Sequence, residues 1–255
     1  MLSSTPFFKI NDQAISLGQA LRYLQFSGKL PNFVQSILQQ HILFEEIQQR
    51  PEIDVSLADV ELATKNFRDK YQLTDSNRFE QWLSMNATDF ATFHKQIAFS
   101  LKLEKLKAEV TEAKLEEYFL ERKNLLDRVV ISCLVVEYQE FAQELKNRLM
   151  EGISFEQLGR EYAANSEKVV NFRTGTISRG EMPELLRNEV DTATVGELVG
   201  PILIDDNWYL LRVEQLLPVA LDGEIKRQLQ NELFEQWLRE KLAKSSIKME
   251  LQESF

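Results

Sequence analysis

Few side chains in this chain are suited to chemistry. Its 255 residues include one cysteine, Cys133, and two histidines, His41 and His94, which lie far apart in sequence. A single thiol excludes an internal disulfide framework and a zinc site built from several thiolates. The acidic pairs at 116–117 and 205–206 consist of adjacent residues, so their carboxylates do not converge as those of a catalytic pair do. We therefore expect no metal site and no cofactor.

The charge balance limits the classes of partner. The chain has 30 basic and 40 acidic residues and a net charge of −10, which argues against nucleic acid as a partner because phosphate binding needs a basic surface. No stretch approaches the roughly 18 apolar residues of a membrane span. The first residues lack the basic start and apolar run of a signal peptide, so the expected location is cytoplasmic.

The elements of the first half are predicted to be helices. Apolar residues recur there at helical spacing, and Ser16 with Gln19 forms a capping-box pattern that would start the first helix. Pro51 ends the second predicted helix. We expect six helices, which begin near Ser16, Pro31, Ser56, Arg78, Phe90 and Thr111. These residues thus predict an all-α domain.

The pattern changes after residue 127. The run Val-Val-Ile-Ser-Cys-Leu-Val-Val over 129–136 is typical of a strand buried on both faces. A helix closed by Gly152 and a second helix capped by Ser154 should follow it. A short strand over 169–177, with Gly175 in a turn, and a closing hairpin over 201–214 complete a compact α+β unit.

The chain becomes helical again after Pro218. Its apolar stripe comprises Leu221, Ile225, Leu229, Leu233, Trp237 and Leu242. Such a stripe must be covered, and the N-terminal helices are the natural partner. We therefore predict an α+β protein in which an all-α domain, built from both chain ends, carries an inserted α+β domain with a small antiparallel sheet. The predicted boundaries are 1–125 for the helical domain, 126–217 for the inserted domain and 218–255 for the returning helix.

Three segments of the inserted domain resemble parvulin-type (PpiC-type) peptidyl-prolyl cis-trans isomerases. They are residues 145–162, with their helix, Gly and Phe-x-x-Leu spacing; residues 175–186, which contain Arg-Gly-x-Met; and the closing hairpin over 195–213. The whole chain is similar to SurA-like proteins, in which chaperone helices flank a parvulin domain. The opening Phe-Lys-Ile-Asn-Asp-Gln-Ala-Ile-Ser over 8–16 also looks like the start of such chaperone domains.

The resemblance implies a degenerate active site. Family members carry histidine in the first and last strands of the domain, and the resemblance places Ser132 and Tyr209 at these catalytic positions. Ile204 stands where a Thr or Ser is usual, and the Asp or Cys of the family's loop falls near residues 164–165. No histidine occurs between residues 128 and 214.

An apolar pocket for proline is the larger requirement of the reaction. The amide barrier is about 18 to 20 kcal/mol, and an enzyme lowers it by binding the twisted amide better than the planar forms. The resemblance assigns substrate binding to five residues, Met182, Leu185, Leu186, Ile204 and Trp208. We expect Ser132 and Tyr209 to converge with Met182 on one concave surface, and Cys133 to be a buried thiol facing the other side of the sheet.

Three hypotheses follow. The first is a SurA-like chaperone that binds unfolded or extended polypeptide, proline-containing segments included, with weak or lost isomerase activity. The second is a working isomerase in which Tyr209 and Ser132 replace the histidines. The third is an adaptor that holds one peptide precursor for an export machinery. A chaperone protects unrelated clients from aggregation, whereas an adaptor does not.

Overall fold

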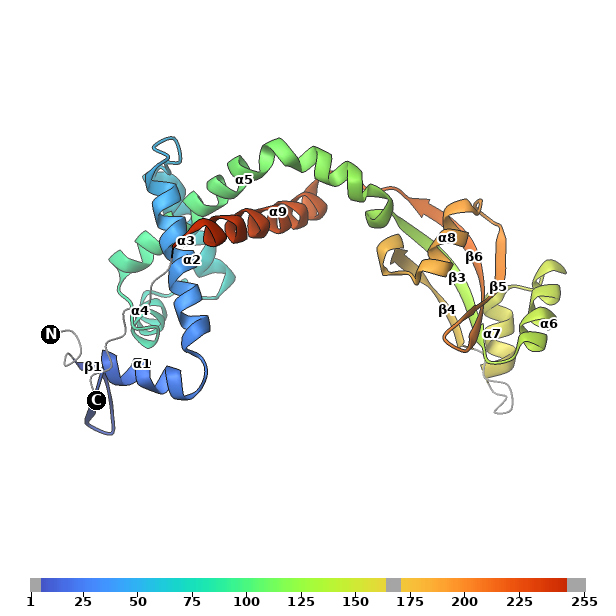
Figure 1. Ribbon diagram of the computed structural model, residues 1–255, viewed down its shortest axis with the longest axis horizontal. Coiled ribbons are helices and arrows are strands. Elements are labelled where there is room, and N and C mark those ends of the chain that lie inside the picture. Colours follow the sequence, from blue (N-terminus) through green and yellow to red (C-terminus); the bar gives the residue numbers. More distant parts are fainter. Residues whose placement is uncertain (1–5, 164–170, 247–255) are drawn as a thin grey trace. The chain divides into compact units, whose positions relative to one another are not determined.

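The computed structural model of the protein describes residues 6–163 and 171–246 (Figure 1). The chain divides into two compact units. One combines the chain up to Lys114 with the chain from Gln230 onward, and the other consists of Leu115–Leu229. This is the predicted α+β architecture: a helical unit is built from both chain ends, and a sheet-containing unit is inserted between them in the sequence. Among the described residues, none of the helices has the length and apolar character needed to cross a membrane.

The helical unit begins with a hairpin that the sequence analysis missed. Strand β1 (Pro6–Ile10) pairs antiparallel with β2 (Gln13–Ser16), so the prediction of an all-α domain was wrong at this end. Asn11 and Asp12, which adopt positive φ angles of 47° and 65°, form the turn. These are the residue types that tolerate such a two-residue turn best after glycine.

Helices make up the rest of this unit. They are α1 (Leu17–Phe26), α2 (Leu30–Gln48), α3 (Leu57–Lys70), α4 (Ser76–Met85), and parts of α5 (Phe90–Leu126) and α9 (Gly223–Lys244). The predicted cap of α1 is confirmed, because the Ser16 side chain accepts a hydrogen bond from the backbone N–H of Gln19 at 3.2 Å.

Helix α5 is continuous where two helices were expected. Thr111, the predicted start of a new helix, is buried, and its hydroxyl donates a hydrogen bond of 2.7 Å to the carbonyl of Lys107. A threonine that bonds one turn back in this way is compatible with a helix interior. The break predicted at residue 111 was therefore wrong.

The returning helix α9 shares a core with the N-terminal helices. Phe234 of α9 packs in one cluster with Leu43 and Ile47 of α2. Ile53, which lies between α2 and α3, and Leu106 of α5 belong to the same cluster. A second cluster, formed by Phe79, Leu83 and Phe93, joins α4 to α5.

The second unit is built on a four-stranded antiparallel sheet with the order β4-β3-β6-β5. The strands are β3 (Arg128–Val136), β4 (Asn171–Ser178), β5 (Leu198–Ile204) and β6 (Asn207–Leu217). The hairpin of β5 and β6 confirms the prediction, with Asp205 and Asp206 at positive φ in its turn. Gly175 lies inside β4 opposite Ile131, so its predicted place in a turn was wrong.

Helices cover both faces of this sheet. Helix α8 (Glu184–Thr192) packs on one face, and α6 (Gln139–Met150) and α7 (Phe155–Ala163) pack on the other. The central strand β3 supplies Val129 and Cys133 to the first cluster and Leu134 and Val136 to the second. Its burial on both faces is as predicted.

Candidate functional site

The face of the sheet under α8, here called the α8 face, gathers most of the predicted site residues. Met182, which follows a 3-10 turn at Arg179–Glu181, packs in one cluster with Leu186 of α8 and Ile204 of β5. Tyr209 of β6 is half-buried against the same cluster. The structure thus brings together four of the predicted residues.

The interior of this face is closed. The exposed fractions of Met182, Leu186 and Ile204 are only 4%, 5% and 7%, so these side chains fill a core. Tyr209 and Ile202, which pack against this core, are half-buried and so keep part of their surface in contact with solvent.

Two predicted binding residues lie elsewhere. Leu185 is 58% exposed on α8, next to the buried Leu186. Trp208 packs in the cluster on the opposite face, with Leu210 and the helices α6 and α7. Its place in the α8-face site was wrong, because the neighbours Trp208 and Tyr209 point to opposite faces of a strand.

Ser132 also lies on the opposite face. It pairs across the sheet with Arg212, whose guanidinium lies 5.4 Å from the centroid of the Phe155 ring of α7. Burial opposes ionisation of Glu214, but hydrogen bonds from Arg212 and Ser132 outweigh it and lower the pKa of this carboxyl. The predicted convergence of Ser132 with Tyr209 and Met182 was therefore wrong.

Cys133 takes the place on the α8 face that Ser132 was expected to occupy. The thiol packs with Met182 and Leu211 and is 5% exposed. Burial raises its pKa to about 11, against a smaller opposing effect of the Arg173 charge. The thiol is therefore protonated at neutral pH and does not act as a nucleophile, which confirms the prediction of a buried core thiol. The prediction that the side chains of Cys133 and Ser132 point to opposite faces of the sheet is also confirmed.

The one-residue error has a physical cause. Side chains alternate along a strand, so shifting a strand's register by one residue exchanges its faces. Both Ser132 and Cys133 stand in an apolar run that is buried on both sides, so alternation of polar and apolar residues gives no signal there. Cys133 is therefore a residue of the α8 face that the sequence analysis did not assign to the site.

A tight backbone contact holds Tyr209 against the edge strand. Gly200 of β5 has a φ of +100°, and a Cβ added to it would lie 2.3 Å from the carbonyl oxygen of Tyr209. The Lys146 ammonium of α6 donates a hydrogen bond of 2.7 Å to the Gly200 carbonyl. Glycine is required here because both the φ angle and the close approach exclude a side chain.

The remaining chemistry of the site is sparse. Within residues 6–163 and 171–246, no group of three or more His, Cys, Asp or Glu side chains is placed to hold a metal ion. The loop position expected near Ala164 or Asn165 lies outside the described residues. On the α8 face, Tyr209 supplies a hydroxyl and Cys133 a neutral thiol within an otherwise apolar cluster.

Parts of the chain are similar to known proteins. Residues 110–223 match the family model of the PPIC-type PPIASE domain. The foldase protein PrsA of Bacillus subtilis (strain 168) is 22% identical over 190 residues, which cover 68% of this chain and 63% of that protein. The chain thus aligns with less than two thirds of the length of this relative.

Solved structures were also found. Peptidylprolyl isomerase PrsA from Bacillus cereus is 17% identical, with a TM-score of 0.49 over 98% of this chain and 95% of its own. One of two SurA-like chaperones from Campylobacter jejuni is 11% identical, with a TM-score of 0.36 over 95% of this chain and 98% of its own. Residues 110–223 of the chain therefore form a domain of the PPIC-type PPIASE family.

Proposed function

We propose that the protein binds unfolded or extended polypeptide as a SurA-like chaperone and that its isomerase activity is weak or lost. The observation that carries this proposal is the composition of the α8 face. That face has a closed apolar core with the half-buried Tyr209 and Ile202 packed against it, and the sequence from 128 to 214 contains no histidine.

The chemistry of proline isomerisation explains the expected low rate. The reaction forms no new covalent bond and depends on stabilising the twisted amide more than its planar forms. Polar groups placed around that amide supply much of such stabilisation. Among the hydrophobic residues of the cluster around Met182, Tyr209 supplies a hydroxyl, and the Arg173 guanidinium lies opposite Cys133 on the same face of the sheet. Because Met182 itself is buried, the ring of a bound proline must first displace side chains to reach it.

A working isomerase that uses Tyr209 is the second candidate. It is favoured by the position of the Tyr209 side chain, which is half-buried in the same cluster as Met182. Its hydroxyl would donate to the amide during rotation. The accompanying role predicted for Ser132 is not supported, since Ser132 lies on the other face.

A protease-free proline-isomerisation assay separates these candidates. The full chain is compared with Tyr209→Phe, which removes only the hydroxyl, and with Tyr138→Phe as the matched control, because Tyr138 is 61% exposed and outside the cluster. We expect rates near the uncatalysed rate for all three proteins. A clear rate that Tyr209→Phe abolishes and Tyr138→Phe retains would establish the isomerase instead.

Aggregation assays test the chaperone part. The full chain is added to several unrelated unfolding proteins, and light scattering is followed. Suppression across the panel supports a chaperone. Suppression of none of them would contradict it and would favour an adaptor for one peptide precursor, whose delivery to an export machinery is a further proposal.

The cytoplasmic location is also a proposal. Fractionation of cells that produce the native protein tests it, since recovery in the membrane or outside the cytoplasm would contradict it.

A further inference from the structure

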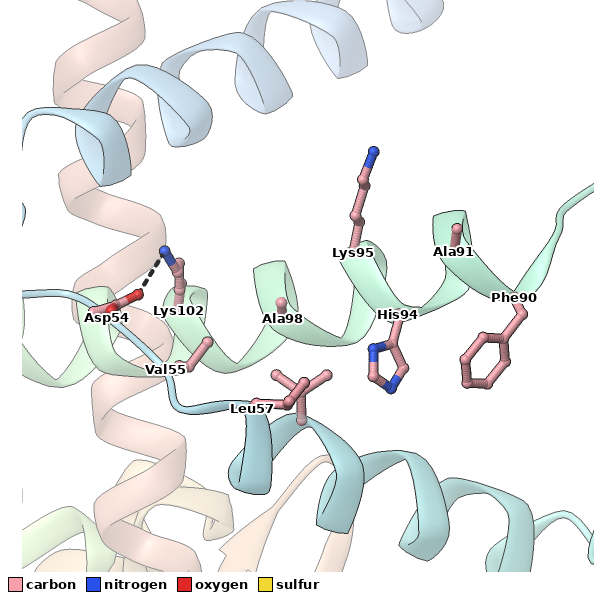
Figure 2. A pocket seen from close by; sticks show the side chains of 10 residues that line it. Asp54, Val55, Leu57, Phe90, Ala91, His94, Lys95, Ala98 and Lys102 are labelled. Carbon is pink, nitrogen blue, oxygen red and sulfur yellow. Dashed lines mark ion pairs between the residues drawn. The ribbon is translucent and has the colours of Figure 1, made fainter.

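The helical unit carries a groove that is not part of the α8 face. It lies between the start of α3 and one side of α5 and has a volume of about 590 Å³ (Figure 2). This volume is within the roughly 300–1,000 Å³ range of ligand sites. Leu57 and Val60 of α3 and Phe90, Ala91 and Ala98 of α5 provide its apolar lining.

The apolar lining is open to solvent. Leu57 is 67% exposed and Phe90 is 53% exposed. Ala91 and Ala98 are seven residues apart on α5 and so lie on one side of the helix, where their small side chains leave the hollow between the larger groups. Exposed apolar surface that rims a groove is typical of a binding site.

Charged side chains at the groove are of two kinds. Lys102 forms an ion pair with Asp54, with its Nζ atom 3.1 Å from Oδ1. Lys95, in contrast, forms no ion pair within the part of the chain that the structure describes. The charge of Lys95 acts on Asp89, but the Asp89 carboxylate is already bonded to the backbone N–H of Thr92 at 2.7 Å.

Figure 2 shows how these groups are arranged. Lys95 extends from one side of α5 and Leu57 lies on the other, with Ala98 between them in this view. The groove therefore has Lys95 on one side of the small residues of α5 and, on the other side, a wall in which His94 lies with the apolar Leu57 and Phe90. A complementary ligand has an apolar side chain and a carboxylate a few ångströms apart.

We propose that this groove docks segments of client polypeptide in which an apolar side chain lies close to an Asp or Glu. The apolar side chain lies over Ala91 and Ala98 against Leu57, and the carboxylate pairs with Lys95. The net charge of −10 repels acidic segments from the protein as a whole. Lys95, which has no ion-pair partner among the described residues, therefore selects where such segments bind beside the apolar wall. The inference rests on the proposed polypeptide-binding function.

Peptide binding to the full chain tests the proposal. Short labelled peptides of Gly and Ser carry a Leu-Leu pair followed two residues later by either Asp or Asn, and fluorescence anisotropy gives their Kd values. We expect the Asp peptide to bind about two- to fivefold tighter than the Asn peptide, as for one exposed ion pair, and this preference should disappear at high salt.

Variants separate the two features of the groove. Lys95→Glu should abolish or reverse the preference for the Asp peptide, whereas Lys114→Glu should retain it, because Lys114 is an exposed lysine of the same helix outside the groove. Leu57→Ser should weaken both peptides about tenfold through lost apolar burial. All three positions are exposed or line the open groove, so the variants should fold.

The outcomes are distinct. Equal binding of both peptides to the unchanged protein, or a preference for the Asp peptide that survives Lys95→Glu, would contradict the proposed docking groove. Either result would leave the proposed polypeptide binding intact. No binding of either peptide, together with no suppression of aggregation, would overturn the proposed function and the groove with it. No binding in a protein that does suppress aggregation would overturn the groove alone.

Discussion

Ser132 and Cys133 are neighbours in β3 and belong to opposite faces of the sheet. The Cys133 thiol packs with Met182 on the α8 face, whereas the Ser132 hydroxyl bonds to Glu214 on the face covered by α6 and α7. The candidate peptide-binding face therefore presents a neutral thiol where a hydroxyl was expected. Substitutions of Cys133 therefore test the α8 face, whereas substitutions of Ser132 test the polar cluster that it forms with Arg212 and Glu214 on the other face.

The Cys133 thiol should make stability depend on alkaline pH. Its pKa rises from 9.0 in the unfolded chain to about 11 in the folded protein, so its contribution is complete below pH 9 and is lost as the pH rises toward 11. The loss should reach about 2 kcal/mol near pH 10.5. Urea unfolding of the unchanged protein and of Cys133→Ala, at about pH 8 and 10.5, measures it. Identical pH dependence of the two proteins would contradict the burial of the thiol.

Alanine substitutions of Met182 and Leu185 should have very different effects on the free energy of unfolding, although the family resemblance assigned both residues to one pocket. Met182→Ala removes a side chain that is 4% exposed and should cost about 2–4 kcal/mol of the free energy of unfolding. Leu185→Ala removes one that is 58% exposed and should cost less than about 0.5 kcal/mol. Chemical denaturation measures both values, and similar costs would show that Met182 is not part of the core.

This difference also affects the choice of variants in activity assays. Because Met182→Ala should destabilise the domain, a lost isomerase rate in that variant would not identify a pocket residue. Met182→Leu conserves volume and should cost less than about 1.5 kcal/mol, so it is the better probe beside Tyr209→Phe.

Strands and turns could be predicted from the sequence better than the face of the sheet to which a given side chain points. The strand over 129–136 and the Asp205-Asp206 turn were recognisable because β-branched runs and two-residue Asp turns are local signals. The choice between Ser132 and Cys133 depended on register, for which a strand buried on both sides gives no periodic signal. Tertiary packing settles that choice.

Two other errors have local causes. The break expected at Thr111 came from reading a threonine as a helix start, but its hydroxyl is satisfied within the helix by Lys107. The β1–β2 hairpin was missed because Asn11-Asp12 is a weaker turn signal than a pair that contains glycine.

Asp127 should stabilise the sheet-containing unit through contacts with two distant segments. Its carboxylate accepts hydrogen bonds from the Lys123 ammonium at 2.9 and 3.0 Å and from the backbone N–H of Val219 at 2.8 Å. Its carbonyl accepts from the N–H of Arg179 at 2.9 Å. Asp127→Ala leaves the Val219 N–H without this acceptor and should cost about 1–3 kcal/mol.

Asp127→Asn is the matched variant for that measurement. An amide oxygen can still accept from Val219 but lacks the charge that pairs with Lys123. Its cost in thermal or urea unfolding should therefore be the smaller of the two. Equal costs would assign the effect to the ion pair with Lys123 and not to the backbone hydrogen bond.

Glu46 should make the helical unit sensitive to acid. Burial opposes ionisation of this carboxyl, but hydrogen bonds and charges of Lys241 and Arg50 outweigh it and lower its pKa below 4.5. A lowered pKa contributes stability above pH 4.5 that is lost as the pH falls through the folded value. Glu46→Gln should cost about 1–3 kcal/mol at neutral pH and flatten the acid limb of the unfolding curve. Glu45→Gln, at an exposed neighbouring position, should do neither.

Gly200 provides a test of how Tyr209 is positioned. A Cβ at residue 200 would lie 2.3 Å from the Tyr209 carbonyl oxygen, and the backbone of a paired strand cannot move away from it freely. Gly196 has a similar φ of +88° but no atom within 4 Å of its added Cβ. Gly196→Ala therefore reports the strain of positive φ alone, about 1 kcal/mol. Gly200→Ala should cost at least about 2 kcal/mol more than that, since separating β5 from β6 also breaks sheet hydrogen bonds.

The same pair of variants connects stability to function. If polypeptide binds at Tyr209 and Ile202, then Gly200→Ala should weaken peptide binding to the α8 face under conditions where the variant is still folded by circular dichroism, and Gly196→Ala should bind as the unchanged protein does. A folded Gly200→Ala protein with undiminished binding would place the peptide elsewhere, and binding that depends on Lys95 alone would place it in the groove of the helical unit.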